Sequence, residues 1–209
     1  MNSLSTSSSE LEVINLDNAV IGILSDDPMF ATGLKGLLKK IAPLGQGAVV
    51  DSDRTKFIMV DLDSLHQSIF HLVRSLSGLR AYDLYRIVFW TSNQAEHTLN
   101  FVRLIDNASF INKKAPLESV EQAVKQVLSG SRFVTPEVQH MFQTSNGPGR
   151  VTEETFTILD DMMSGMRVKC IAAKLNTADK SIYSKLRQFR ERLSLLRKSD
   201  FLSFIHDIS

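Results

Sequence analysis

Residues 19–142 alternate between short apolar runs and helical periodicity. Apolar runs of strand length occupy residues 19–24, 57–60, 87–90 and 109–112. Elsewhere apolar side chains recur every three or four positions, as on one face of an amphipathic helix, in residues 30–41, 69–76, 99–105 and 117–128. Strands and helices that alternate in this way predict an α/β domain with a doubly wound parallel sheet.

Beyond a cluster of Gly, Pro, Asn and Ser at 145–149, the pattern is helical only. Apolar spacing predicts helices near residues 152–163, 168–175 and 180–193. A last amphipathic helix at 201–208 either pairs two domains or closes the hydrophobic core. We therefore expect four parts: a flexible N-terminal segment (1–18), an α/β domain (19–143), a linker (144–150) and an all-α domain (151–209).

Composition places the chain among folded proteins and excludes several classes. Of its 209 residues, 43% are apolar and 22% are charged, which is not the composition of a disordered chain. No apolar run approaches the roughly 20 residues of a membrane helix, and the Ser-rich N-terminus does not resemble a signal peptide. A single cysteine, Cys170, excludes a disulfide framework. We expect a cytoplasmic protein that does not contact a membrane, with Cys170 buried in its helix.

Charge is concentrated in the all-α part. The net charge is only +1, but residues 166–198 contain ten basic and two acidic side chains. Such a block predicts a polyanionic partner for this part of the chain alone. The alternative is a basic three-helix bundle that keeps a solvated face or binds another protein.

Polar residues follow each of the four predicted strands. They are Asp26 and Asp27, Asp61, Thr91, and Lys113. In an open α/β sheet the functional site lies at the carboxyl ends of the strands, so these side chains should meet. Carboxylates of Asp26, Asp27 and Asp61 are suitable ligands for Mg²⁺. A carboxylate there can attack a phosphoryl group while a hydroxyl and an ammonium bind the transferred oxygens.

These segments resemble the receiver domain of two-component response regulators over residues 19–140. The resemblance is carried by ILSDDPMFATGLKGLL, FIMVDL, VFWTS and ASFINKKAPLESVEQAVKQVLSGSRFVTPEV. It implies a five-stranded sheet, Asp61 as phospho-acceptor, Thr91, Phe110 and Lys113 as switch residues, and a sensor kinase as partner. The family's second helix is reduced or absent here, and the loop 62–65 departs from the family pattern. Control by phosphorylation and a phosphorylation-independent pseudo-receiver are therefore both open.

The all-α part resembles the helix-turn-helix domain of LuxR/FixJ (NarL)-type transcription factors. The matching segment is VTEETFTILDDMMSGMRVKCIAAKLNTADKSIYSKLRQFRERL. The resemblance implies that base edges are read by Tyr183, Ser184 and Arg187. It implies that phosphates are met by Lys180, Ser181, Lys185 and Arg190. The function it implies is that of a transcriptional regulator, not an enzyme, which binds double-stranded promoter DNA as a dimer under control of the receiver-like domain.

Two other functions fit parts of the sequence. The protein could act as a co-regulator that works mainly by forming a heterodimer with another regulator. Asp61 and Asp63 also fit the two aspartates of the DxDx(S/T) motif of haloacid-dehalogenase-type phosphatases, in which the first Asp attacks phosphate and the second protonates the leaving group. In that family the metal-binding acidic pair follows the lysine, whereas here it precedes Asp61, and this order favours the receiver.

Overall fold

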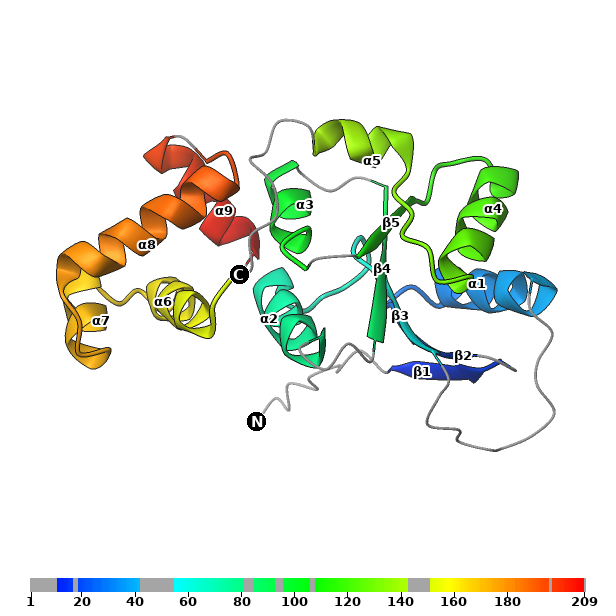
Figure 1. Ribbon diagram of the computed structural model, residues 1–209, viewed down its shortest axis with the longest axis horizontal. Helices are drawn as coiled ribbons and strands as arrows, with labels where there is room; N and C mark the ends of the chain where they lie inside the picture. The colour runs from blue at the N-terminus through cyan, green and yellow to red at the C-terminus, as the bar shows by residue number, and fades with distance from the viewer. Residues whose placement is uncertain are drawn as a thin grey trace, which may run out of the picture. The chain divides into compact units, whose positions relative to one another are not determined.

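The computed structural model describes residues 11–16, 19–41, 55–80, 85–92, 96–105, 108–142, 151–195 and 197–208 (Figure 1). The chain forms two compact units. The first comprises Met1–Gln67, Gly78–Gln94 and Asn107–Gln139. The second comprises Ser68–Ser77, Ala95–Asp106 and His140–Ser209. The expected linker at 144–150 lies outside the described residues.

A five-stranded sheet organises the first unit, with the strand order β1-β2-β3-β4-β5. The strands are β1 (Glu12–Asn15), β2 (Ala19–Leu24), β3 (Thr55–Asp61), β4 (Tyr85–Thr91) and β5 (Ser109–Asn112). Strands β2 to β5 are parallel, with Ile23 paired to Met59 and Met59 to Val88. The expected fold class, an α/β domain with a five-stranded sheet, is confirmed; the sheet is parallel as expected except for β1, which pairs antiparallel with β2.

The sequence pattern located four strands, and the fifth strand of the sheet is β1. Residues 1–18 were expected to be flexible, yet Glu12–Asn15 pairs antiparallel with β2 at the edge of the sheet. The strand has four residues and only the side chain of Ile14 is buried, so its sequence shows no apolar periodicity. The prediction of a flexible segment is therefore wrong for these residues. The expected loss of a second helix concerns residues 42–54, which lie outside the described residues.

Helices α1 (Pro28–Ile41) and α4 (Leu117–Leu128) pack together and bury their apolar faces against the sheet. The core they share with β2, β3 and β4 includes Leu34, Leu38, Met59, Val88, Trp90 and Val124. Helix α4 ends as its sequence predicts, because Gly130 at φ +92° adopts a conformation that side chains rarely allow. A short helix, α5 (Pro136–Met141), follows.

In its described residues the second unit is built from helices. It contains α3 (Glu96–Val102), α6 (Glu153–Met163), α7 (Val168–Lys174), α8 (Asp179–Arg192), α9 (Lys198–Ile208) and most of α2 (Ile69–Arg80). None of the helices in the described part of the chain has the length and hydropathy needed to cross a membrane.

Six buried phenylalanines form the centre of this second unit. We call them the phenylalanine cluster: Phe70, Phe101, Phe156, Phe189, Phe201 and Phe204, each at most 5% exposed. Ring centroids lie 5.8 Å apart for Phe70 and Phe156, and 5.4 Å apart for Phe101 and Phe204. Through Phe201 and Phe204, helix α9 closes the hydrophobic core, which was one of its two expected roles.

Polar contacts fix the helix ends and pairings of this unit. Thr152 caps α6 by accepting a hydrogen bond from Thr155 N at 3.3 Å. Lys174 Nζ of α7 donates to Asp161 Oδ1 of α6 at 2.7 Å. Arg74 of α2 binds Glu153 and, at 3.0 Å, Asp160 of α6, and the hydrogen bond to Glu153 raises the pKa of Arg74.

Cys170 is exposed, so the expectation that it is buried is wrong. Helix α7 has only seven residues and buries Ile171 and Ala172. The residue just before that pair therefore points to solvent.

Candidate functional site

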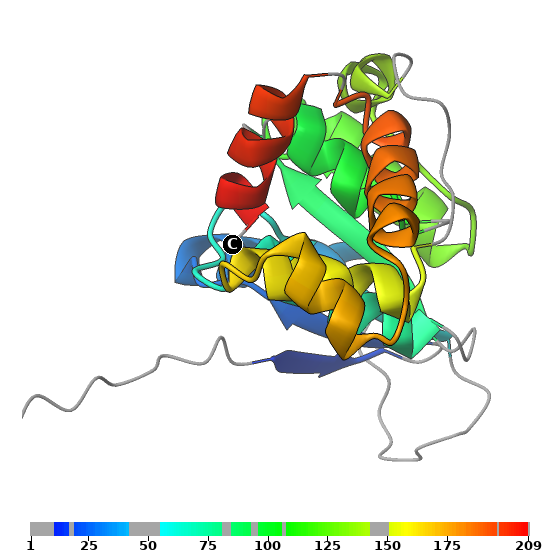
Figure 2. The same ribbon diagram turned by 90° about the vertical axis from the view of Figure 1, so that its left-hand side faces the viewer.

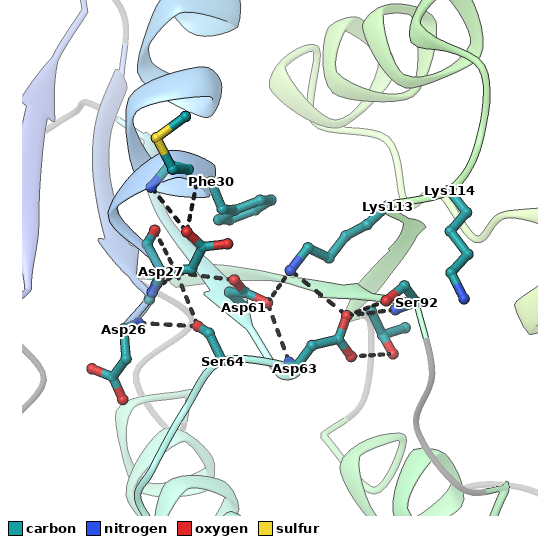
Figure 3. Close-up of polar contacts among 12 residues, drawn as sticks. Asp26, Asp27, Phe30, Asp61, Asp63, Ser64, Ser92, Lys113 and Lys114 are labelled. Atoms are coloured by element: carbon teal, nitrogen blue, oxygen red, sulfur yellow. Dashed lines mark hydrogen bonds and ion pairs between the residues drawn. The ribbon is translucent and has the colours of Figure 1, made fainter.

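Polar side chains meet at the carboxyl ends of the parallel strands, as the strand-end pattern predicts (Figure 3). Asp61 ends β3 and is fully buried. Lys113, directly after β5, donates from Nζ to Asp61 Oδ1 at 2.7 Å. Ser25, directly after β2, donates from Oγ to Asp61 Oδ2 at 2.9 Å. A lysine and a hydroxyl therefore compensate the buried carboxylate.

The acidic residues after β2 accept hydrogen bonds from backbone N–H groups. Asp27 caps helix α1, because its Oδ1 accepts from the backbone N–H of Met29 at 2.9 Å and of Phe30 at 3.2 Å. Asp26 Oδ2 accepts from His66 N at 2.8 Å, and the Asp26 carboxylate points away from Asp61 (Figure 3).

Within the described ranges, no three His, Cys, Asp or Glu side chains are grouped so as to hold a metal ion. Mg²⁺ is commonly held by one or two carboxylates and several waters, so its binding by Asp26, Asp27 and Asp61 stays a prediction. In the structure a helix N-terminus offers Asp27 two free backbone donors, and the side chain that reaches Asp61 from this loop is the hydroxyl of Ser25.

Thr91 is turned towards Asp63 in the described contacts. Its hydroxyl donates to Asp63 Oδ1 at 3.2 Å. Ser92 donates to Asp63 Oδ2 from both its backbone N and its Oγ, each at 2.7 Å. The predicted switch aromatic, Phe110, is fully buried, with its ring centroid 5.3 Å from that of Phe89.

Three serines of this site were missed from the sequence. Ser25 and Ser92 bind the two aspartates, and Ser64 Oγ accepts from Asp26 N at 3.0 Å and lies 3.0 Å from Ser25 Oγ. Each lies within three residues of the end of a strand, which is the signal that could have pointed to them.

Helix α8, drawn in orange in Figure 2, has one buried and one exposed face, as predicted; the burial of its residues shows this division. Ile182, Leu186 and Phe189 are buried. On the exposed face lie Lys180, Tyr183, Ser184, Arg187 and Gln188. Gln188 was not singled out from the sequence, although it is four residues from Ser184. The side chain of Arg187 is 80% exposed and donates from Nε to Glu191 Oε1 at 2.8 Å; this hydrogen bond raises the pKa of Arg187.

The other residues of α8 that were predicted to contact DNA lie between the buried and the exposed face. Ser181 and Lys185 are half-buried, and Lys185 forms an ion pair with Glu154 of α6. Arg190 is also half-buried; its Nε donates to the carbonyl of Leu195 at 3.3 Å, and its guanidinium lies 5.7 Å from the ring centroid of Phe201. These contacts tie Lys185 and Arg190 to their own domain, so contacts of theirs with phosphate stay a prediction.

Comparison by sequence finds no matching protein-family model and no matching curated protein. By structure, RcsB in two dimers bound to two parallel DNAs matches with a TM-score of 0.50 and 20% identity, over 93% of this chain and 100% of that chain. RcsB from Salmonella enterica serovar Typhimurium, bound to promoter rprA in the presence of phosphomimetic BeF3−, matches with a TM-score of 0.51, 20% identity and the same coverage. The chain has the fold of RcsB. RcsB is a two-component response regulator, so the fold expected from the resemblance is confirmed.

The contacts of Asp63 also bear on the phosphatase alternative. That reaction needs the second aspartate to protonate a leaving group. Here both carboxylate oxygens of Asp63 are held by hydroxyl and N–H donors of Thr91 and Ser92. Because both oxygens accept hydrogen bonds from these residues, the contacts do not place Asp63 to donate a proton to a leaving group on Asp61.

Proposed function

We propose that this protein is a sequence-specific transcriptional regulator that binds double-stranded promoter DNA as a homodimer through helix α8. The observation that carries the proposal is the division of α8 into a buried apolar face and an exposed face with Lys180, Tyr183, Ser184 and Arg187. Helix α7 precedes α8 across a short turn in which Asn176 has φ +50°. Two helices joined by such a turn are how a recognition helix enters the major groove.

Two side chains have distinct expected tasks at the DNA. Arg187 can donate two hydrogen bonds to the major-groove edge of guanine, which reads sequence. Lys180, at the exposed start of α8, can pair with a phosphate, which positions the helix without reading sequence. The fold shared with RcsB, described in complex with DNA, supports this assignment. We place the regulator in the cytoplasm and propose no enzymatic reaction for it.

Fluorescence anisotropy on duplexes selected from a random pool tests the proposal. Arg187→Ala should lose about 1–3 kcal/mol at the selected duplex, roughly 5- to 150-fold in affinity, and relax the preference at one base pair. Lys180→Ala should weaken binding to all duplexes alike and lower the salt slope by about one unit. Arg197→Ala is the matched control, because Arg197 is exposed but lies outside α8. If Arg187→Ala binds every duplex as tightly as the wild type does, α8 is not the reading helix.

For the control of DNA binding we propose the phosphorylation-independent mode. The hydrogen bonds that the Asp26 and Asp27 carboxylates accept from backbone N–H groups support this choice, since both carboxylates are engaged away from Asp61 and Mg²⁺ assists phosphoryl transfer. Addition of Mg²⁺ with beryllium trifluoride, a mimic of an aspartyl phosphate, should then leave DNA affinity unchanged. A tenfold tightening that disappears in Asp61→Asn would instead establish control by phosphorylation.

The homodimer and the heterodimer with another regulator can be distinguished in solution. Purified protein that sediments as a dimer with the selected duplex supports the homodimer. Selective binding that appears only when another regulator is added supports the co-regulator alternative.

A further inference from the structure

Four donors surround the carboxylate of Asp63. They are the hydroxyl of Thr91 at 3.2 Å, the N–H and the hydroxyl of Ser92 at 2.7 Å each, and the ammonium of Lys113 at 3.6 Å. We call Thr91, Ser92 and Lys113 the oxyanion cradle. Hydroxyl, N–H and ammonium donors aimed at one point are what a protein uses to bind a negatively charged oxygen.

The cradle lies next to the carboxylate that was expected to accept a phosphoryl group. Lys113 Nζ is 2.7 Å from Asp61 Oδ1 and 3.6 Å from Asp63 Oδ2, so one ammonium bridges both aspartates. Asp63 N also donates to Asp61 Oδ1, at 3.2 Å. Figure 3 shows the Lys113 ammonium joined to both Asp61 and Asp63. The oxygens of a phosphoryl group on Asp61 would therefore point towards donors that now bind the carboxylate of Asp63.

The side chain of Asp63 is only 18% exposed, which weakens the competition from water for these donors. An incoming oxyanion would have to displace a carboxylate of the same charge from the cradle. Both the lost hydrogen bonds and the charge repulsion oppose that exchange.

We infer that Asp63 is a built-in substitute for a phosphoryl group: its carboxylate fills an oxyanion-binding cradle formed by Thr91, Ser92 and Lys113, and holds these residues as a phosphate on Asp61 would. The regulatory meaning of this inference rests on the proposed function. The existence of the cradle does not, because it is a property of the first unit alone.

Removing the carboxylate should open the cradle to an external oxyanion. The experiment measures the melting temperature of the full chain as inorganic phosphate replaces chloride at constant ionic strength, without Mg²⁺. Asp63→Ala should gain about 3 °C or more at saturating phosphate, because a ligand that binds only the folded state stabilises it. The wild type should bind phosphate at least tenfold more weakly.

Two further variants show whether the response comes from the cradle. Asp26→Ala removes the same charge from the loop after β2, but the Asp26 carboxylate accepts from His66 N and points away from Asp61, so this variant should respond like the wild type. Ser92→Ala added to Asp63→Ala removes one cradle hydroxyl and should weaken phosphate binding. If Asp63→Ala does not fold, Asp63→Ser takes its place, since a serine hydroxyl can still accept from the Ser92 N–H.

Three results would overturn the inference. They are a wild type that responds to phosphate as strongly as Asp63→Ala does, a folded Asp63→Ala that does not respond at all, and a response of Asp26→Ala equal to that of Asp63→Ala. DNA binding by the same proteins is measured separately. If none of them, the wild type included, prefers its selected duplex over random DNA, the proposed function fails while the phosphate titration still decides the role of Asp63.

Discussion

Phe101 of α3 should be the most sensitive position of the phenylalanine cluster. Its side chain is fully buried, and its ring centroid lies 6.4, 6.2 and 5.4 Å from those of Phe70, Phe189 and Phe204. Truncation of a buried Phe to Ala removes the transfer free energy of the ring and leaves a cavity, which together cost about 3–5 kcal/mol. For a chain of this size, that corresponds to a fall in melting temperature of roughly 6–20 °C.

Urea unfolding followed by circular dichroism measures this loss. The matched control is Leu202→Ala in α9, because Leu202 is apolar but 56% exposed and should change the free energy of unfolding by no more than about 0.5 kcal/mol. A double-mutant cycle with Phe101→Leu and Phe204→Leu then isolates the contact between α3 and α9. Aromatic pairs in contact couple by about 0.5–1.5 kcal/mol beyond the area they bury.

Two results would refute the reasoning behind this prediction. A loss below about 1 kcal/mol for Phe101→Ala would mean that Phe101 is not enclosed by the helices of the second unit. Additive effects in the cycle, within about 0.3 kcal/mol, would mean that α9 closes the core without touching α3.

Three further predictions concern single side chains. Asp27→Ala should lose the cap of α1, about 1 kcal/mol in thermal unfolding, equally with and without Mg²⁺; a loss seen only with Mg²⁺ would make Asp27 a metal ligand. Asp161→Ala should lower the free energy of unfolding in urea by about 1–3 kcal/mol, because it removes the carboxylate that joins α6 to Lys174 of α7. No loss would mean that the hydrogen bond between Lys174 and Asp161 does not stabilise the fold. Glu191→Ala should change the free energy of unfolding by no more than about 0.5 kcal/mol. It should tighten binding of the selected duplex about twofold, because Arg187 loses its hydrogen bond to Glu191 and is free to bind DNA. Unchanged affinity would mean that Glu191 does not compete with DNA for Arg187.

Secondary structure was predictable wherever several apolar side chains are buried together. The strand Ser109–Asn112 lies at the predicted residues, because it buries three consecutive residues, and the helix Leu117–Leu128 does so because it buries one face. Strand β1 and helix α5 were not predicted. They are short, and β1 buries only Ile14, so their positions depend on neighbours that sequence periodicity does not reveal.

The candidate site was predictable in its position but not in its pairings. The strand-end rule brought Asp61 and Lys113 together correctly. It did not show that Asp27 caps α1, although Asp27 stands directly before Pro28, the first residue of that helix. One partner of Asp63 is the backbone N–H of Ser92, just after β4. That contact joins residues 29 positions apart in the sequence and leaves no spacing to read.

The antiparallel pairing of β1 with β2 has a consequence for how the chain folds. Only three positions separate the two strands, and Leu16 N donates to Ala19 O at 2.8 Å in that connection. Pairing across such a short loop is a local event that takes on the order of microseconds. Each parallel pair of strands in this sheet forms only after a long crossover segment has brought the two strands together. The hairpin can therefore form before residues 55–61 arrive, and it offers β3 an edge that is already aligned. On this view the N-terminal strand is the first part of the sheet to fold, and removal of residues 12–15 should slow refolding more than it lowers the final stability.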